Sequence, residues 1–165
     1  MKGSDVSLKH LQRALTMELT TINTYLYQER QLNDWGIGRL AERMKEEVDE
    51  ERGHANRFLT RILFLDGSPD VQTLSEIEKP SSVKQIFEVQ HRMEKEAVAY
   101  YNKAAVECQE AGDVGSFNLF RKILKDEEEH IDFVEEQLGL MEMIGYQLYI
   151  ARQVPSVAEE EDDDI

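Results

Sequence analysis

The sequence predicts an all-α protein: a four-helix bundle with one long crossover connection and a short fifth helix near the C-terminal end. Three observations support this prediction. Apolar residues recur at helical spacing through four long segments, all three prolines lie outside these segments, and glycines interrupt the periodicity between them. The 165 residues, of which 41% are hydrophobic, are enough for one domain with a sizeable core.

The first two helices are predicted to form an antiparallel hairpin. The first runs from Asp5 to about Asn33, and its apolar stripe consists of Leu8, Leu11, Leu15, Leu19, Ile22 and Leu26. The second runs from about Ile37 to Leu65, and its stripe consists of Leu40, Met44, Val48, Ala55, Phe58 and Ile62. Residues 33–36 have turn composition, and so short a connection places the two helices side by side in opposite directions.

The second hairpin follows a long connection. Residues 66–82 contain Gly-Ser-Pro-Asp and Lys-Pro-Ser-Ser and show weak periodicity, so we expect a loop there. About 17 extended residues reach over roughly 50 Å, whereas a helix of about 29 residues is roughly 43 Å long. The loop can therefore cross the whole bundle. The third helix is predicted from Ser82 or Val83 to about Ala111, and the fourth from about Val114 to Ile144, with a short turn between them.

The C-terminal residues divide into a short helix and a tail. Gly145 ends the fourth helix, and Tyr146 to Gln153 are expected to form the fifth. Glu159 to Asp164 are consecutive acidic residues, and such blocks of like charge are usually solvated and disordered. We therefore expect one domain over residues 1–158 and an acidic, disordered tail over residues 159–165.

The charge of the chain limits its partners. A net charge of −15 disfavours nucleic acid and anionic membrane surfaces and favours attraction of small cations. The sequence has neither an apolar run long enough to span a membrane nor the apolar segment of a signal peptide. Its single cysteine, Cys108, excludes an intramolecular disulfide and a thiolate metal cluster. These features predict a soluble cytoplasmic protein.

Two segments of the chain carry the candidate chemistry. Each has Glu and His three positions apart, so that both side chains lie on one face of a helix. The two motifs are 76 positions apart, and the same offset relates further residues of the two hairpins. The residues paired by this offset are Glu51 with Glu127, His54 with His130, Glu18 with Glu94, and Tyr25 with Tyr101. The two hairpins therefore read as approximate copies about a pseudo-two-fold axis.

The four glutamates are predicted to lie together inside the bundle. In each hairpin they are equally far from the turn, about 25 Å away, and each occupies an apolar stripe. Four carboxylates in an apolar core are unfavourable unless they bind cations. Carboxylate and imidazole without thiolate suit Fe or Mn, with Zn as a competitor. We expect two iron ions per chain, bridged by Glu51 and Glu127, because each of these lies next to a histidine in its motif. Glu18 and Glu94 are then terminal ligands.

Over about residues 1–153 the chain resembles the bacterioferritins of the ferritin-like superfamily. The matching stretches are Leu15–Thr20, Trp35–Gly36, Arg61–Gly67 and Leu124–Asp132. The resemblance implies a ferritin-like bundle, a hollow shell of twenty-four subunits that stores ferric mineral, and a ferroxidase centre in each subunit that oxidises Fe(II) with O2 or H2O2. At the matching positions the metal ligands are Glu18, Glu51, His54, Glu94, Glu127 and His130. Tyr25 matches a family tyrosine near the iron centre.

One position departs from this resemblance. Bacterioferritins hold haem b between two subunits through a methionine that follows the second-helix glutamate, and the residue here is Arg52. A guanidinium group has no lone pair to give to iron. A homomeric shell of this chain is therefore not expected to bind haem in the usual way. A mixed shell, in which another subunit type supplies the methionine, is an alternative way to bind haem.

Several other residues have more than one interpretation. Glu47 and Glu50 are candidate additional metal ligands along an iron path or inner wall, or else part of a solvated helix face. His10 and His91 are interpreted as surface or boundary residues rather than ligands.

Three functions follow from these observations. The main hypothesis is iron storage and detoxification through ferroxidase chemistry. A different di-iron oxidase is an alternative, although the chain lacks the cysteines of a rubredoxin-like electron-transfer domain. A structural subunit of a mixed shell is the other alternative. The complete ligand set argues against it, and Arg52 argues for it.

Overall fold

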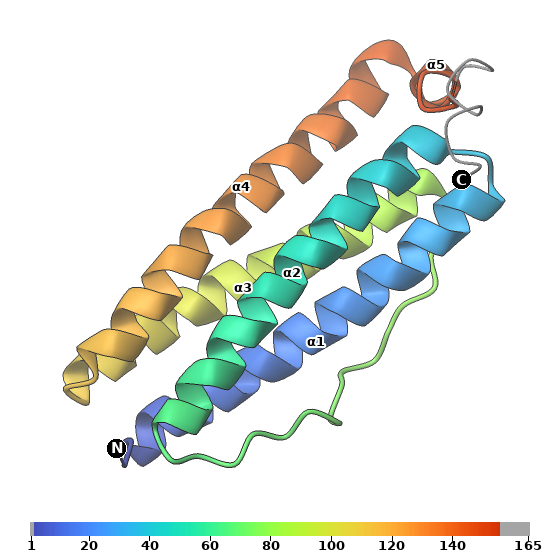
Figure 1. Ribbon diagram of the computed structural model, residues 1–165. Helices are drawn as coiled ribbons and strands as arrows, with labels where there is room; N and C mark the ends of the chain where they lie inside the picture. The colour runs from blue at the N-terminus through green and yellow to red at the C-terminus, as the bar shows by residue number, and fades with distance from the viewer. Residues whose placement is uncertain (1, 156–165) are drawn as a thin grey trace.

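The computed structural model describes residues 2–155, which form a four-helix bundle of two antiparallel hairpins, with a short fifth helix at one end (Figure 1). The helices are α1 (Asp5–Asp34), α2 (Gly38–Phe64), α3 (Val83–Glu110), α4 (Val114–Ile144) and α5 (Tyr146–Ala151). No strand occurs within the described residues. The predicted all-α fold is confirmed, with helix ends that agree to within two residues. The predicted acidic tail lies outside the described residues and stays a prediction.

Local sequence explains where the long helices begin and how the hairpins turn. The side chains of Ser4, Ser82 and Asp113 each accept a hydrogen bond from a backbone N–H three residues later, at the starts of α1, α3 and α4. Gly36 and Gly112 lie in the two hairpin turns with φ of 74° and 77°, a region that glycine enters without steric cost. These two glycines are also 76 positions apart, so the internal repeat extends to the turns.

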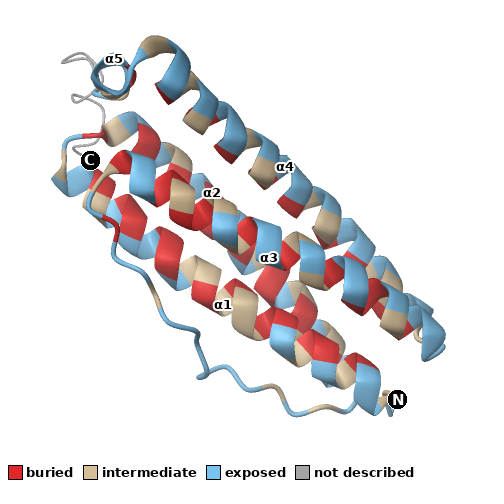
Figure 2. Cartoon of the chain, turned by 180° about the vertical axis from the view of Figure 1, so that it is seen from behind, coloured by how far each residue is buried: buried red, intermediate tan, exposed pale blue. Residues whose placement is uncertain are grey.

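The crossover segment runs from the end of α2 to the start of α3 along the outside of α1 (Figures 1 and 2). Side chains of α1 hold it in place. The Gln12 amide exchanges two hydrogen bonds, of 2.9 and 2.8 Å, with the backbone of Asp70. The backbone N–H of Ser75 donates to Thr20 Oγ1 at 3.0 Å. The segment therefore crosses the bundle as predicted and lies against α1.

The core consists of two apolar clusters with a polar layer between them. One cluster includes Leu11, Leu15, Phe58, Tyr101, Phe120 and Ile123. The other includes Leu32, Leu40, Met44, Ile86, Phe87 and Met141. Along each long helix the two sets are separated by at least one buried glutamate, and Figure 2 shows that buried positions line the inner sides of the helices. Burial of apolar surface on both sides holds the polar layer at the middle of the bundle.

One residue of the predicted α1 stripe lies outside the core. Leu26 is 47% exposed, whereas its neighbour Tyr25 is 2% exposed and takes the inward position. The helical period allows either residue to follow Ile22, three or four positions on. The tyrosine is drawn inward because its hydroxyl has a partner in the polar layer.

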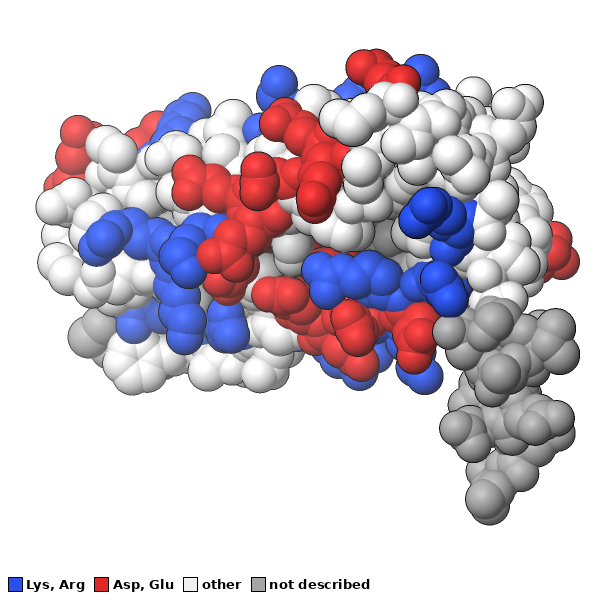
Figure 3. Space-filling view, turned by 90° about the horizontal axis from the view of Figure 1, so that it is seen from above, with Lys and Arg blue, Asp and Glu red and all other residues white. Residues whose placement is uncertain are grey.

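The surface carries both signs of charge. On the face shown in Figure 3, Lys and Arg side chains lie beside Asp and Glu side chains rather than in separate fields. Within residues 2–155, none of the helices combines the length and the apolar character that crossing a membrane requires.

Candidate metal centre

Six side chains from four helices meet in the polar layer. They are Glu18 of α1, Glu51 and His54 of α2, Glu94 of α3, and Glu127 and His130 of α4. Each is at most 7% exposed. The structure therefore brings together all six residues that the sequence singles out, at one level of the bundle.

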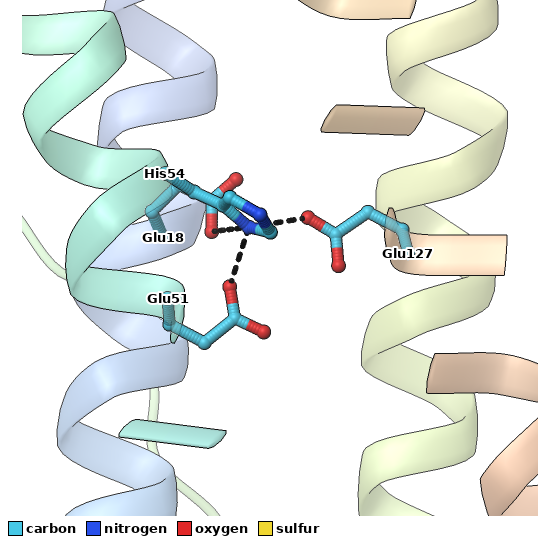
Figure 4. Close-up of side chains that lie close together, drawn as sticks. All are labelled: Glu18, Glu51, His54 and Glu127. Atoms are coloured by element: carbon cyan, nitrogen blue, oxygen red, sulfur yellow. Dashed lines mark hydrogen bonds and ion pairs between the residues drawn. The ribbon is translucent and has the colours of Figure 1, made fainter. Parts of the chain in front are cut away.

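The glutamates Glu51 and Glu127 each divide their two oxygens between the two histidines. His54 Nδ1 lies 3.1 Å from Glu51 Oε2 and 3.2 Å from Glu127 Oε1. His130 Nδ1 lies 3.2 Å from Glu51 Oε1 and 3.1 Å from Glu127 Oε2. Figure 4 shows the first half of this arrangement, with Glu18 Oε2 3.9 Å from the same His54 nitrogen. Two carboxylates thus link two separate imidazoles.

The potential ligand atoms of these six residues fall into two overlapping groups. One group is Glu18, Glu51, His54 and Glu127, and the other is Glu51, Glu94, Glu127 and His130. Within each group, one ligand atom per residue lies within 4.8 Å of the others. Glu51 and Glu127 belong to both groups, which is the pattern that two metal positions with shared bridging carboxylates require.

Several atoms of this centre are buried without a hydrogen-bond partner. They include Glu51 Oε1, Glu127 Oε2 and both ring nitrogens of His130. The nearby groups lie at ion-pair distance but not in hydrogen-bonding geometry. Unpaired buried polar atoms are rare in native proteins and call for an explanation such as a bound ion. The donor set therefore fits a metal.

Two tyrosines support the outer glutamates of the centre. The hydroxyl of Tyr101 on α3 donates to Glu18 Oε1 of α1 at 2.5 Å. The hydroxyl of Tyr25 on α1 donates in return to Glu94 Oε1 of α3. The sequence singled out Tyr25 alone as an auxiliary residue. Tyr101 was identifiable from its offset of 76 from Tyr25, and the structure shows that the two tyrosines have equivalent contacts.

The electrostatics of the centre follow from burial and from its crowded charges. Burial, assisted by neighbouring carboxylates, raises the pKa of Glu18 and of Glu94. Burial opposes ionisation of Glu51 too, but the positive charge of the two neighbouring histidines lowers its pKa to about 2. Burial alone lowers histidine pKa values, yet the carboxylates of Glu127 and Glu51 raise that of His54 to about 10 and that of His130 to about 12. Without a bound metal ion, both histidines are therefore protonated near neutral pH, and their positive charges balance those of the neighbouring carboxylates.

A second layer of acids lies behind the histidines. His54 Nε2 is 3.3 Å from Asp126 Oδ2, and His130 Nε2 is 3.0 Å from Glu47 Oε2 and 3.6 Å from Glu50 Oε2. A carboxylate behind a ligating histidine orients the ring and strengthens it as a ligand. Sequence reasoning identified Glu47 and Glu50 but missed Asp126. The available signal was the offset, because Asp126 lies 76 positions after Glu50.

The remaining candidates lie away from the centre. Arg52 is on an exposed side of α2, where its guanidinium group contacts Asp49 at 3.0 Å and its side chain is 68% exposed. It offers no lone pair for haem iron. His10 is buried, and its ring nitrogens contact the Tyr100 hydroxyl and Glu107 Oε2 of α3, each at 2.7 Å, whereas His91 contacts Glu135 of α4.

Comparisons with known proteins agree with this geometry. Residues 8–144 match the ferritin-like domain. The chain is 41% identical over 149 residues to a bacterioferritin of Brucella melitensis, a match that covers 90% of this chain and 92% of that protein. It is 37% identical over 147 residues to a bacterioferritin of Rhodobacter capsulatus, covering 89% and 91% of the two chains. It is 38% identical over 154 residues to a bacterioferritin of Mycobacterium leprae, covering 93% and 97%.

Proposed function

Since this chain belongs to the bacterioferritins within the ferritin-like family, we propose that it takes up Fe(II), oxidises it at a dinuclear ferroxidase centre and stores the ferric product. The observation that carries this proposal is the placement of Glu51 and Glu127. Each is buried, and each directs one oxygen towards His54 and the other towards His130. Two adjacent metal positions sharing two carboxylates are the simplest chemical use of that arrangement.

The six residues have distinct roles in this proposal. Glu51 and Glu127 bridge two Fe(II) substrate ions. Glu18 and His54 complete one position, and Glu94 and His130 complete the other. Two Fe(II) ions supply two electrons, which reduce O2 with two protons to H2O2, or H2O2 with two protons to two waters. Six protein ligands for two ions leave coordination positions free for the oxidant.

The surrounding residues prepare the centre for this reaction. Iron binding requires neutral imidazole, so His54 and His130 release their protons as the metal binds. Tyr25 and Tyr101 hold the carboxylates of the terminal ligands by hydrogen bonds. The apolar clusters on both sides lower the polarity around the centre, which strengthens the attraction between the carboxylates and the ions.

The proposed assembly is a hollow cytoplasmic shell of twenty-four such chains, with residues 1–158 as one domain. A second function has one observation in its favour. Arg52 replaces a haem ligand expected from the resemblance, so the chain is also a candidate structural subunit, without chemistry of its own, of a mixed shell whose partner carries the methionine. Ferroxidase activity of the isolated chain distinguishes the two: a purely structural subunit has none.

The test is Fe(II) oxidation by the purified shell. We expect rapid formation of ferric absorbance for the first two Fe(II) per chain, and ferric iron that stays with the shell during gel filtration. Glu51→Ala abolishes the rapid phase. Arg52→Ala, which changes the next residue of the same helix, leaves it unchanged. Equal rates in the wild type and in Glu51→Ala contradict the proposal.

A further inference from the structure

A surface groove leads to the carboxylate side of the centre. It is a cavity of about 300 Å³ between α1, α3 and the crossover segment. Four glutamates lie along its inner end: Glu18, Glu51, Glu94 and Glu127. Within the described part of the chain, neither histidine of the centre lines this cavity. An ion in the groove therefore meets carboxylate oxygens before it meets imidazole.

The inner end of the groove offers unpaired ligand atoms. Glu51 Oε1 and Glu127 Oε2 are buried without a hydrogen-bond partner, and both side chains are at most 2% exposed. Unpaired buried carboxylate oxygens are costly unless a cation reaches them. This observation distinguishes the groove from an ordinary acidic surface, where water satisfies each carboxylate.

The mouth of the groove carries an arginine among acids. Arg92 Nη2 on α3 donates to both oxygens of Glu78 in the crossover segment, each at 2.9 Å. The two side chains are 57% and 59% exposed. Glu76 and Glu96 also line the groove. An exposed ion pair of this kind is weakly stabilising, so it opens at little cost.

Two separate elements build this mouth. Ser75 lines the groove three residues before Glu78, and its backbone N–H is bound to Thr20 of α1. The anchored segment thus holds the Glu78 carboxylate opposite Arg92. The guanidinium charge stays at the mouth, where it repels a dication, as long as this contact lasts.

We propose that Fe(II) reaches the centre through this groove and that Arg92 acts as a charge gate at its mouth. The proposal rests on the proposed ferroxidase function and adds the route of the substrate and the residue that slows it. Glu78 has two effects: it attracts the cation and it partly neutralises the gate. Loss of Arg92 speeds metal binding, and loss of Glu78 slows it, while the number of ions bound at equilibrium stays the same.

The experiment follows binding of Co(II) to the metal-free shell by stopped-flow absorbance. Co(II) takes oxygen and nitrogen ligands as Fe(II) does, and its visible bands report binding without oxidation. We expect Arg92→Ala to bind roughly three- to ten-fold faster than the wild type, and Glu78→Gln to bind slower by a similar factor. The matched control is Lys125→Ala, which removes an equal charge from the exposed Lys125–Glu129 pair of α4 and leaves the rate unchanged.

A second variant blocks the groove after folding and assembly. Ser75→Cys is labelled at the mouth with a bulky group through a disulfide, whereas the native Cys108 is fully buried and stays unlabelled. We expect labelling to remove the fast binding phase and reductive removal of the label to restore it. If the labelled shell binds Co(II) at the unlabelled rate, or if Arg92→Ala behaves like Lys125→Ala, the groove is not the route.

These outcomes are separate from a failure of the proposed function. If the wild type does not bind two Co(II) per chain at equilibrium, the proposal of a dinuclear centre is wrong, and the proposed route to it is wrong as well. If it binds two, and only the rates fail to respond, the centre stands and the route is wrong.

Discussion

The two hairpins contribute the same residue types to the candidate metal centre, but the layer behind it is only partly repeated: Asp126 is the counterpart of Glu50, whereas Glu47 has no acidic counterpart. The inner layer consists of the six central residues and the two tyrosines, and each of these side chains has a counterpart 76 positions away. Their contacts are equivalent in the two hairpins: Tyr25 donates to Glu94, and Tyr101 donates to Glu18. Behind His54 lies Asp126, whereas behind His130 lie Glu50 and the buried Glu47. The counterpart of Glu47 in the other hairpin is Ile123, a fully buried core residue.

This difference indicates which part of the internal repeat the proposed metal binding requires. Two bridging carboxylates require symmetry at the centre itself. The second layer differs, because His54 contacts Asp126 whereas His130 contacts Glu47 and Glu50, so the two metal positions of the proposed centre have different surroundings. The predictions below test the symmetry of the inner layer and the asymmetry of the outer one.

The largest expected effect comes from removing a bridging glutamate. Glu51→Ala and Glu127→Ala each lose a ligand of both metal positions. Both should therefore reduce the initial rate of Fe(II) oxidation by more than the roughly 10- to 100-fold that loss of a second-layer partner causes. Stopped-flow absorbance of the ferric product measures this. A large loss in one variant and near-normal activity in the other contradicts bridging by both residues.

The second-layer acids should have intermediate and unequal effects. Asp126→Asn weakens metal binding at the His54 position, and Glu47→Gln weakens it at the His130 position, each by roughly 10- to 100-fold. Anaerobic metal titrations should then separate into two steps, with one tight ion and one weak ion per chain. Equal weakening of both ions in either variant contradicts the assignment of each acid to one position.

Metal binding should depend on pH with a known sign. His54 and His130 have pKa values raised to about 10 and about 12, so both are protonated near neutral pH and must lose a proton to bind metal. Affinity therefore rises with pH, by about tenfold per pH unit for each proton released. Calorimetry in buffers of different ionisation enthalpy counts these protons. Each of His54→Gln and His130→Gln should lower the count by one, and a pH-independent affinity contradicts this account.

The smallest effect should come from the tyrosines, and it should be equal. Tyr25→Phe and Tyr101→Phe each remove one hydrogen bond to a terminal glutamate, a contact worth about 1.5–3 kcal/mol when the acceptor is charged. Part of this is recovered when metal binds the carboxylate, so we expect only a several-fold slower oxidation in each variant. If one variant loses much more oxidation activity than the other, that tyrosine has a role beyond positioning its glutamate, and the two halves of the centre are not equivalent.

Much of this architecture was predictable from the sequence, for physical reasons. Helical periodicity, the two glycine turns and the length of residues 66–82 determine the bundle and its crossover. The offset of 76 and the spacing of Glu and His identified the six central residues, because spacing alone decides which face of a helix a residue occupies.

Other features depend on contacts between helices that spacing does not encode. Asp126 can be found from its offset of 76 from Glu50, but its contact with His54 depends on how α4 is rotated against α2. The same holds for Tyr101 reaching across to Glu18, and for Leu26, which an apolar pattern placed inside although Tyr25 takes that position. The groove beside Arg92 depends on where the crossover segment rests, which only tertiary structure defines.

The most direct test of the central claim is an anaerobic titration of the metal-free protein with Fe(II), followed by O2. The account predicts saturation at two Fe(II) per chain and rapid oxidation of both ions together, and it predicts that Glu51→Ala loses both sites at once. Saturation at one Fe(II) per chain, or loss of only one site in Glu51→Ala, contradicts a centre in which two carboxylates bridge two ions.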